Sequence, residues 1–189
     1  NFITKISNAN NFLQLNKCFY KKNINTKKIK LKINQWIYVE FKKTTELVNK
    51  HLEDFRFDEA SRVIYNFVWG SYCDWYLEFL KPILNSNDAK AKDESSSFSA
   101  YMFMNMLKLL HPFIPFFTEY MWQDNKLNKS LKDDLITSNW PDPQKILSFN
   151  KNSNEIESLI EIIKSIRSTK VQLNIPPKEY CDIIYFKES

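Results

Sequence analysis

A single glycine, Gly70, among 189 residues is the feature that most restricts how this chain can fold. Glycine supplies the positive φ angles of tight turns and the close backbone approach of phosphate-binding loops, so the chain has little material for either. Long helices suit such a composition. Hydrophobic residues make up 43% of the chain, enough for a buried core in one large domain. We therefore predict an all-α fold.

Apolar residues recur at helical spacing in six stretches of the chain. The expected helices cover residues 2–15, 33–52, 57–84, 98–110, 115–122 and 154–170. Pro115 suits the first turn of a helix, whereas Pro176 and Pro177 would end the last one. The three intervening segments predicted to lack regular structure are an exposed lysine-rich connection (17–32), a polar break (85–97) and a mixed loop (124–150).

The segment CDIIYF, residues 181–186, has the composition of a β-strand. We expect it to begin a further small unit that the sequence truncates. The predicted domains are therefore a helical domain over residues 1–172 and the start of a small C-terminal unit over 173–189. The start at Asn1, inside an apparent amphipathic helix, also indicates a fragment of a larger protein.

Positive charge is concentrated at the amino-terminal end. The segment from Asn1 to Val39 contains eight lysines and no Asp or Glu, a charge of +8, whereas the rest of the chain sums to −3. The lysines are Lys5, Lys17, Lys21, Lys22, Lys27, Lys28, Lys30 and Lys32. Such asymmetry is typical of a polyanion-binding surface, because lysines near phosphates release condensed counterions. Charge alone leaves open a solvated, inert loop.

The histidines and cysteines of this sequence do not stand at the spacings that catalytic or metal sites require. His51 and His111 have no second imidazole or cysteine at metal-binding spacing, and His111 precedes a proline, as a capping or packing histidine does. Cys73 lacks an adjacent histidine and is expected to be a buried structural thiol. One glycine cannot supply a Walker-type or GxGxxG loop. We expect neither an active site nor a metal site.

The cysteines and the hydropathy pattern bear on location. Cys18, Cys73 and Cys181 are odd in number and far apart, which indicates a reducing compartment rather than a disulfide framework. No apolar run approaches the roughly 20 residues that cross a bilayer, and no secretory signal is present. We therefore expect a soluble, cytoplasmic protein.

Several motifs carry a resemblance to a known family. Residues 55–82 read FRFDEASRVIYNFVWGSYCDWYLEFLKP, and LLHPFIPFFTEYMWQ, SNWP and IRSTKVQLNIPP follow in order, with LKINQWIYVEF preceding them. Together they resemble the anticodon-binding domain of valyl-tRNA synthetases over nearly the whole chain. The CDWYLE motif favours the valyl enzymes over the related isoleucyl and leucyl ones, which share the bundle and the HPF-like bend.

The resemblance implies an anticodon-binding helical bundle of class I aminoacyl-tRNA synthetases, with a short C-terminal α/β extension. The parent enzyme would be a valine–tRNA ligase that uses ATP with Mg, and its HIGH-like and KMSKS-like motifs would lie upstream. The fragment itself would need no cofactor. Its implied partners are tRNA(Val) and the catalytic and editing domains of the same chain, in a monomer that does not contact membranes.

In that family the first helix and the connection after it approach the anticodon loop. The family's NAxRF motif appears here as Asn8-Ala9-Asn10-Asn11-Phe12, so Asn11 replaces an arginine that could contact base or phosphate. The expected tRNA-binding residues are Asn8, Asn11, Phe12, Lys17, Lys21, Lys22, Lys27, Lys28, Lys30, Trp36, Arg167 and Lys170. Trp36 is expected to lie half in the core and half at the rim.

Other functions remain open at this point. The chain could belong to an isoleucyl- or leucyl-type synthetase, or it could be a helical protein-interaction module whose basic arm docks an acidic partner. The aromatic residues between Trp69 and Phe79 are expected to be mostly core and interhelix packing, because they recur at helical spacing.

Overall fold

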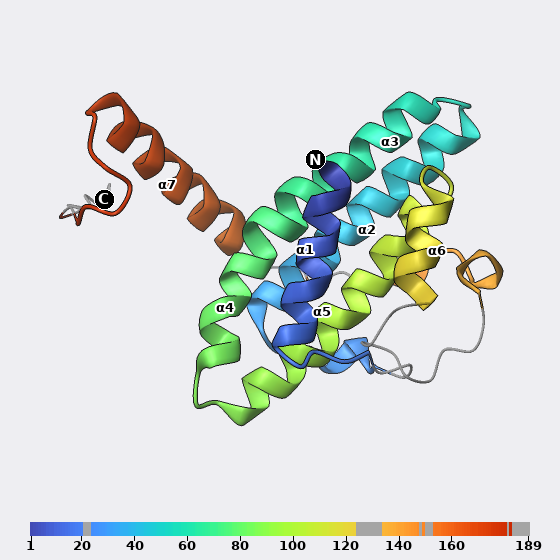
Figure 1. Ribbon diagram of the computed structural model, residues 1–189, viewed down its shortest axis with the longest axis horizontal. Coiled ribbons are helices and arrows are strands. Elements are labelled where there is room, and N and C mark those ends of the chain that lie inside the picture. The colour runs from blue at the N-terminus through green and yellow to red at the C-terminus, as the bar shows by residue number, and fades with distance from the viewer. Residues whose placement is uncertain (21–23, 124–133, 148, 150–152, 181, 183–189) are drawn as a thin grey trace. The chain divides into compact units, whose positions relative to one another are not determined.

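The computed structural model describes residues 1–20, 24–123, 134–147, 149, 153–180 and 182. Within this part of the chain every regular element is helical, so the predicted all-α fold is confirmed (Figure 1). The α-helices are α1 (Phe2–Leu15), α2 (Lys32–Glu53), α3 (Phe57–Asn66), α4 (Leu77–Asn85), α5 (Ala89–Leu110), α6 (Pro115–Gln123) and α7 (Ser153–Gln172). The chain divides into two compact units, Asn1–Ser153 and Asn154–Ser189.

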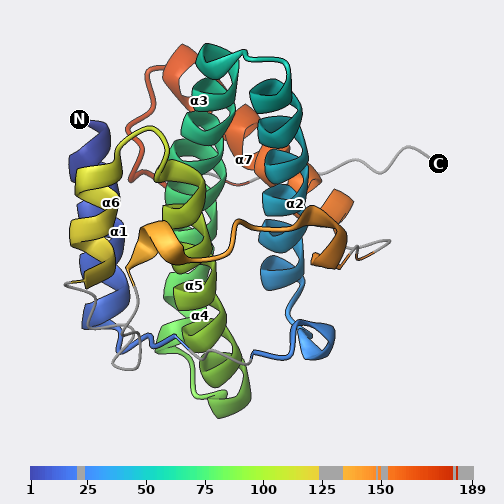
Figure 2. The ribbon, with the colours of Figure 1, turned by 90° about the vertical axis from the view of Figure 1, so that its right-hand side faces the viewer.

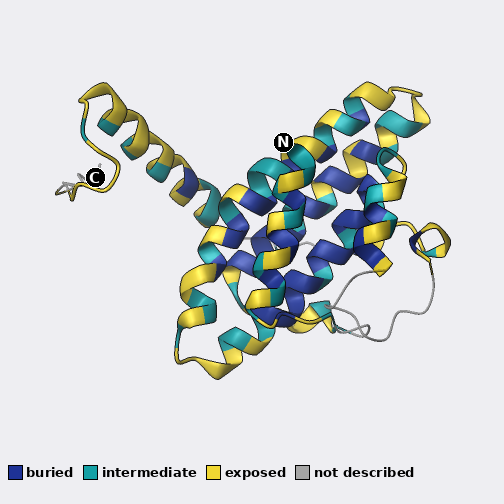
Figure 3. Cartoon of the chain, viewed as in Figure 1, coloured by how far each residue is buried: buried dark blue, intermediate teal, exposed yellow. Residues whose placement is uncertain are grey.

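Unit 1 is a bundle in which α2 and α3 form an antiparallel pair and α5 runs through the interior (Figures 1 and 2). Figure 3 shows the buried residues on the inward faces of these helices, with α5 buried along most of its second half. The described residues of unit 1 also form three short 3₁₀ turns: η1 (Thr26–Lys28), η3 (Leu135–Thr137) and η4 (Pro143–Lys145). The helices predicted over 2–15, 33–52 and 115–122 are confirmed within one residue at each end.

The helix predicted over 57–84 is continuous, but its middle is wound as a π-helix, η2 (Phe67–Tyr76). A π-helix bonds residue i to i+5 and so adds about one residue to each turn. Four residues make slightly more than one turn of an α-helix and slightly less than one turn of a π-helix. A row of every fourth residue therefore rotates around the helix axis in opposite directions in the two kinds of helix. The alternation keeps a single buried row in line across α3, η2 and α4, comprising Ile64, Val68, Tyr72, Tyr76 and Leu80.

With one glycine in the chain, three helices end on other residues in the left-handed conformation. Lys17, Phe55 and Asn174 have φ values of 55°, 57° and 54°. Each follows a helix and forms the paired backbone hydrogen bonds of a Schellman cap, as where Cys18 N donates to Leu13 O at 2.9 Å. The predicted role of the diproline in stopping the last helix is therefore corrected, because the Asn174 cap ends α7 before Pro176 is reached.

Helix α5 begins nine residues earlier than the sequence pattern predicted, so the expected polar break over residues 85–97 is wrong for most of its length. The Asp88 side chain accepts hydrogen bonds from the backbone N–H groups of Lys90 and Ala91, both at 3.0 Å, and so caps the helix. Four serines at positions 95, 96, 97 and 99 are then buried against neighbouring elements. Because serines are polar, the sequence pattern did not indicate that this segment is a buried part of a helix.

Unit 2 contains α7, which is longer than the predicted 154–170. The predicted strand over residues 181–186 falls almost entirely outside the described residues. The domain boundary expected after residue 172 stays a prediction, whereas the compact units divide between Ser153 and Asn154.

Candidate nucleic-acid interface

The lysine-rich connection leads from α1 to α2 at one end of unit 1 (Figures 1 and 2). Lys17, Lys27, Lys28 and Lys30 are exposed on it. None of these four ammonium groups forms an ion pair with another residue in the described part of the chain. We call these four side chains the basic edge. Lys21 and Lys22, also predicted to bind tRNA, lie outside the described residues.

The backbone beneath the basic edge is anchored although its side chains are exposed. Cys18 and Ile29 are buried near its two ends. Asn25 accepts a hydrogen bond from Lys27 N at 3.1 Å and caps η1, and Gln35 Nε2 donates to Ile29 O at 2.8 Å. The expectation of a wholly exposed connection is therefore corrected, because buried anchors alternate with outward-facing lysines.

Side chains of helix α5 hold both ends of the connection. Near the start of the connection, Ser96 Oγ donates to Lys17 O at 3.4 Å. Ser96 and Ser99 also hydrogen-bond the Cys18 thiol, whose pKa is raised by burial. Near the end of the connection, the Glu94 carboxylate accepts hydrogen bonds from the backbone N–H groups of Lys30 and Leu31. Sequence reasoning missed Ser96 and Glu94 because it placed both in the polar break over residues 85–97. The signal for α5 was Asp88 followed by a run of Ala, Lys and Glu, a capped start with high helix propensity.

A cavity of about 480 Å³ lies between the connection and the first turns of α5. Lys28 and Lys90 contribute positive charge to its lining, and Asp93 and Glu94 contribute negative charge. Ile24 and Ile29 add apolar surface. The region therefore offers exposed cations beside a recess of mixed polarity, and exposed cations can follow the phosphates of an RNA loop.

The outer face of α1 continues this surface. Asn8 and Asn11 are exposed, one turn apart, and Phe12 is half-buried. Leu15, which follows Asn11 by four residues, is 83% exposed, so this face of α1 is free of packing within unit 1. The structure thus brings Asn8 and Asn11 to the surface of the helix that leads directly into the basic edge.

Trp36 does not lie at this surface. Its side chain is 3% exposed and lies in the core. Ile33 and Ile37, on the same helix, are also buried. The expectation that Trp36 lies half at the rim is corrected, because the inward face of α2 is wider than the apolar stripe suggested. In unit 2, Arg167 is exposed, and Lys170 Nζ donates to the backbone oxygens of Pro177 and Glu179.

The aromatic residues of η2 pack as predicted from their spacing. Tyr72 and Tyr76 are fully buried, and Trp69 and Trp75 are half-buried. Lys5 lies over the Trp69 ring at 4.7 Å from its centroid and is ion-paired with Asp74. Lys5 is therefore engaged inside unit 1, unlike the lysines of the basic edge.

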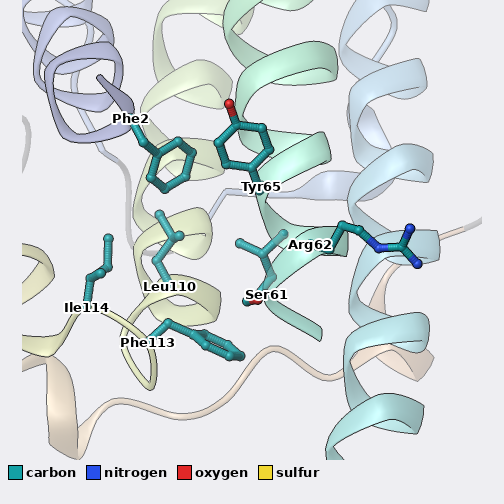
Figure 4. A pocket seen from close by; sticks show the side chains of 8 residues that line it. Phe2, Ser61, Arg62, Tyr65, Leu110, Phe113 and Ile114 are labelled. Atoms are coloured by element: carbon teal, nitrogen blue, oxygen red, sulfur yellow. The ribbon is translucent and has the colours of Figure 1, made fainter. Parts of the chain in front are cut away.

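A second surface feature is an apolar groove near the start of α1. It is lined by Phe2, Tyr65, Leu110 and Phe113, and Figure 4 shows these side chains converging from α1, α3, the end of α5 and the turn that follows it. Its one guanidinium, that of Arg62, is ion-paired with Glu59. Because α1 has 14 residues, the groove lies about 20 Å along the helix axis from Lys17. Its chemistry does not suit a polyanion.

Cys73 and His111, two of the side chains weighed above for catalysis, are both engaged in packing. Burial raises the pKa of the Cys73 thiol to about 12, which keeps it protonated and unreactive. His111 Nδ1 lies 2.9 Å from Thr118 Oγ1 and links the end of α5 to α6, the packing role predicted for it. In the part of the chain described, no three His, Cys, Asp or Glu side chains could hold a metal ion. No described helix has the length and apolarity to span a membrane.

Comparison with known proteins gives one family. The family model described as the anticodon-binding domain of tRNA ligase matches residues 34–185. The valine–tRNA ligase of Pelagibacter ubique is 45% identical over 183 residues, which cover 97% of this chain and 21% of the relative. The valine–tRNA ligases of Agrobacterium fabrum and Caulobacter vibrioides are 39% and 40% identical over 94% of the chain. The chain spans about a fifth of the length of these relatives.

Proposed function

Because this chain belongs to the anticodon-binding domain family of tRNA ligases, we propose that it binds the anticodon stem-loop of tRNA(Val) as part of a valine–tRNA ligase. The parent chain would carry the catalytic and editing domains, use ATP with Mg to attach valine, and act as a cytoplasmic monomer. The bundle would select the tRNA and position its acceptor end for chemistry elsewhere. The names of the relatives support valine over isoleucine or leucine.

The observation that carries the proposal is the basic edge. Four exposed ammonium groups, without ion pairs to described residues, are mounted on a connection whose backbone is anchored to α5. An anchored array costs less conformational entropy on binding than a flexible lysine loop, since the backbone is already ordered. Asn8 and Asn11 extend this surface along α1 with neutral donors and acceptors suited to the exposed edges of loop bases.

In unit 2, Arg167 and Lys170 are proposed to contact the stem. The Lys170 ammonium already donates to two backbone oxygens. The planar guanidinium of Arg167 can bind phosphate oxygens in pairs.

Filter binding of tRNA transcripts to this chain tests the function. We expect tRNA(Val) to bind more tightly than the same transcript with a changed middle anticodon base. Equal, weak binding of both transcripts would rule out anticodon reading by this domain.

A second measurement tests the basic edge. Each phosphate contact contributes close to one unit to the slope of log K against log salt concentration. Replacing Lys27 and Lys28 by alanine should therefore reduce the slope by about two. The matched control, Lys50→Ala with Lys145→Ala, removes the same charge from the far end of α2 and from η4. An equal reduction in this control would show that only net charge matters.

A further inference from the structure

The Glu94 carboxylate, on α5, is one of the polar groups that join the connection to the bundle at the start of α2. Its Oε2 accepts from Lys30 N at 3.0 Å, and its Oε1 accepts from Leu31 N and from Asn34 Nδ2, each at 3.0 Å. Two of the three donors are backbone groups of the connection itself. One side chain on a neighbouring helix therefore fixes where the connection ends and α2 begins.

Helix α2 needs such a partner from outside its own sequence. Its N-cap residue is Leu31, which offers no side-chain hydrogen bond to the unpaired N–H groups of the first turn. From across the bundle, Glu94 accepts from the N–H group of this cap residue and from the side chain of Asn34 in the first turn, and its negative charge is favourable at the positive end of the helix dipole. The Lys30 backbone is held by the same carboxylate, and the Lys30 side chain is exposed to solvent.

Glu94 is itself held by a buried network. Asn34 donates to it, and Asn34 Oδ1 accepts from the Tyr76 hydroxyl at 2.8 Å. Asn34 and Tyr76 are both fully buried. The network therefore runs from η2, through α2, to the carboxylate and on to the backbone of the basic edge.

We propose that Glu94 is a positioning residue for tRNA binding: it holds Lys27, Lys28 and Lys30 in the arrangement that meets the phosphates of the anticodon stem-loop. This inference rests on the proposed function. It assigns an acidic residue a favourable role in a surface that binds a polyanion, although its charge taken alone repels phosphate.

A role through charge and a role through position predict opposite changes in tRNA affinity when Glu94 is neutralised, so the proposal can be tested. If Glu94 acted only through its charge, Glu94→Gln would remove a repulsion and tighten tRNA binding at low salt. If it acts by position, the amide cannot accept all three hydrogen bonds, because one of its two ends is a donor. The lysines then lose their common placement, and binding weakens.

The experiment compares Glu94→Gln with Asp93→Asn in tRNA(Val) binding to this chain at low salt. The Asp93 change removes the same charge from the adjacent residue and leaves the Glu94 hydrogen bonds in place. We expect Glu94→Gln to weaken binding by about fivefold or more and Asp93→Asn to leave it equal or tighter. Binding by Glu94→Gln that equals or exceeds that of the unaltered chain would overturn the proposal.

Two further measurements separate positioning from general destabilisation. Amide hydrogen exchange at Lys30 and Leu31 should accelerate in Glu94→Gln while the amides in the middle of α5 keep their protection. In a chain that already carries Lys27→Ala, Lys28→Ala and Lys30→Ala, adding Glu94→Gln should cause no further loss of binding. A full additional loss there would show that Glu94 acts elsewhere and would refute the proposal.

Should Glu94→Gln fail to fold, Glu94→Asp gives the same discrimination. It keeps the charge and shortens the reach by one methylene, so weaker binding supports positioning and unchanged binding contradicts it. Failure of the unaltered chain to distinguish tRNA(Val) from the changed-anticodon transcript would instead defeat the proposed function. The two failures are therefore distinguishable.

Discussion

The Tyr76 hydroxyl donates a hydrogen bond of 2.8 Å to Asn34 Oδ1, with both side chains fully buried. This contact ties the π-helical segment η2 to the first turn of α2. Burial in the core also raises the pKa of Tyr76 well above its ordinary value, so the hydroxyl stays a donor throughout the working pH range. One buried hydrogen bond therefore joins η2 to the Glu94 network at the start of α2.

Tyr76→Phe is expected to leave Asn34 Oδ1 buried without a partner. An unsatisfied buried acceptor costs about 1–3 kcal/mol of the free energy of unfolding. Urea denaturation followed by far-UV circular dichroism measures the change. Tyr65→Phe, on the exposed face of α3, is the control and should change the stability by less than about 0.5 kcal/mol. Similar losses in both variants would contradict the role given to the buried bond.

Asn11→Arg places a guanidinium on the exposed face of α1 without entering the core. We expect tRNA(Val) to bind several-fold more tightly at low salt, because the new cation can contact a phosphate or stack on a base. Thr4→Arg adds the same charge on the same helix, about 10 Å further from the basic edge, and should have a smaller effect. Equal gains would point to net charge rather than to the position of residue 11.

Phe55→Gly should stabilise unit 1, although it removes an aromatic side chain. Phe55 is 80% exposed and has a φ of 57°, a conformation that costs a residue with a Cβ about 1 kcal/mol relative to glycine. The edge contact with Phe57 is lost but lies at the surface. Thermal unfolding measures the outcome, and a lower melting temperature would show that the aromatic pair outweighs the backbone strain.

Gly70→Ala is the converse change. Gly70 is helical, has no positive φ, and a Cβ built on it would meet no heavy atom within 4 Å. Alanine restricts the unfolded chain and should raise the free energy of unfolding by roughly 0.5–1 kcal/mol. A destabilised Gly70→Ala chain would indicate that the π-helical winding of η2 needs the freedom of glycine.

Cys73 gives a pH dependence of stability. Its pKa is about 12 in the folded chain and near 9.0 as an ordinary thiol, because burial disfavours the thiolate. Above about pH 9 the unfolded chain loses this proton first, so the stabilising contribution is complete below that pH and is lost as the pH rises toward the folded value. Urea midpoints between about pH 8 and pH 10 should fall more steeply for the unaltered chain than for Cys73→Ala. Parallel pH profiles would contradict this assignment.

Local pattern was enough to predict most of the fold. The stripe of α2 and the helix at 2–15 follow from apolar residues at helical spacing, since such a face requires only a partner to bury it. The start of α5 was not predictable in this way, because Ser95 to Ser97 are polar yet buried, and their environment is supplied by other elements. The same reason hides Glu94, whose three hydrogen-bond partners lie 60 to 64 residues away in the sequence.

The helical fold class, the placement of positive charge before residue 40 and the motifs of the family can all be read from the amino-acid sequence, because propensity, charge and motif are properties of neighbouring residues. The folded chain was needed to show which lysines stand on an anchored backbone, that Trp36 is buried, and that η2 is wound as a π-helix. These features depend on hydrogen bonds and packing between segments distant in the chain, and no local pattern records which segments will meet.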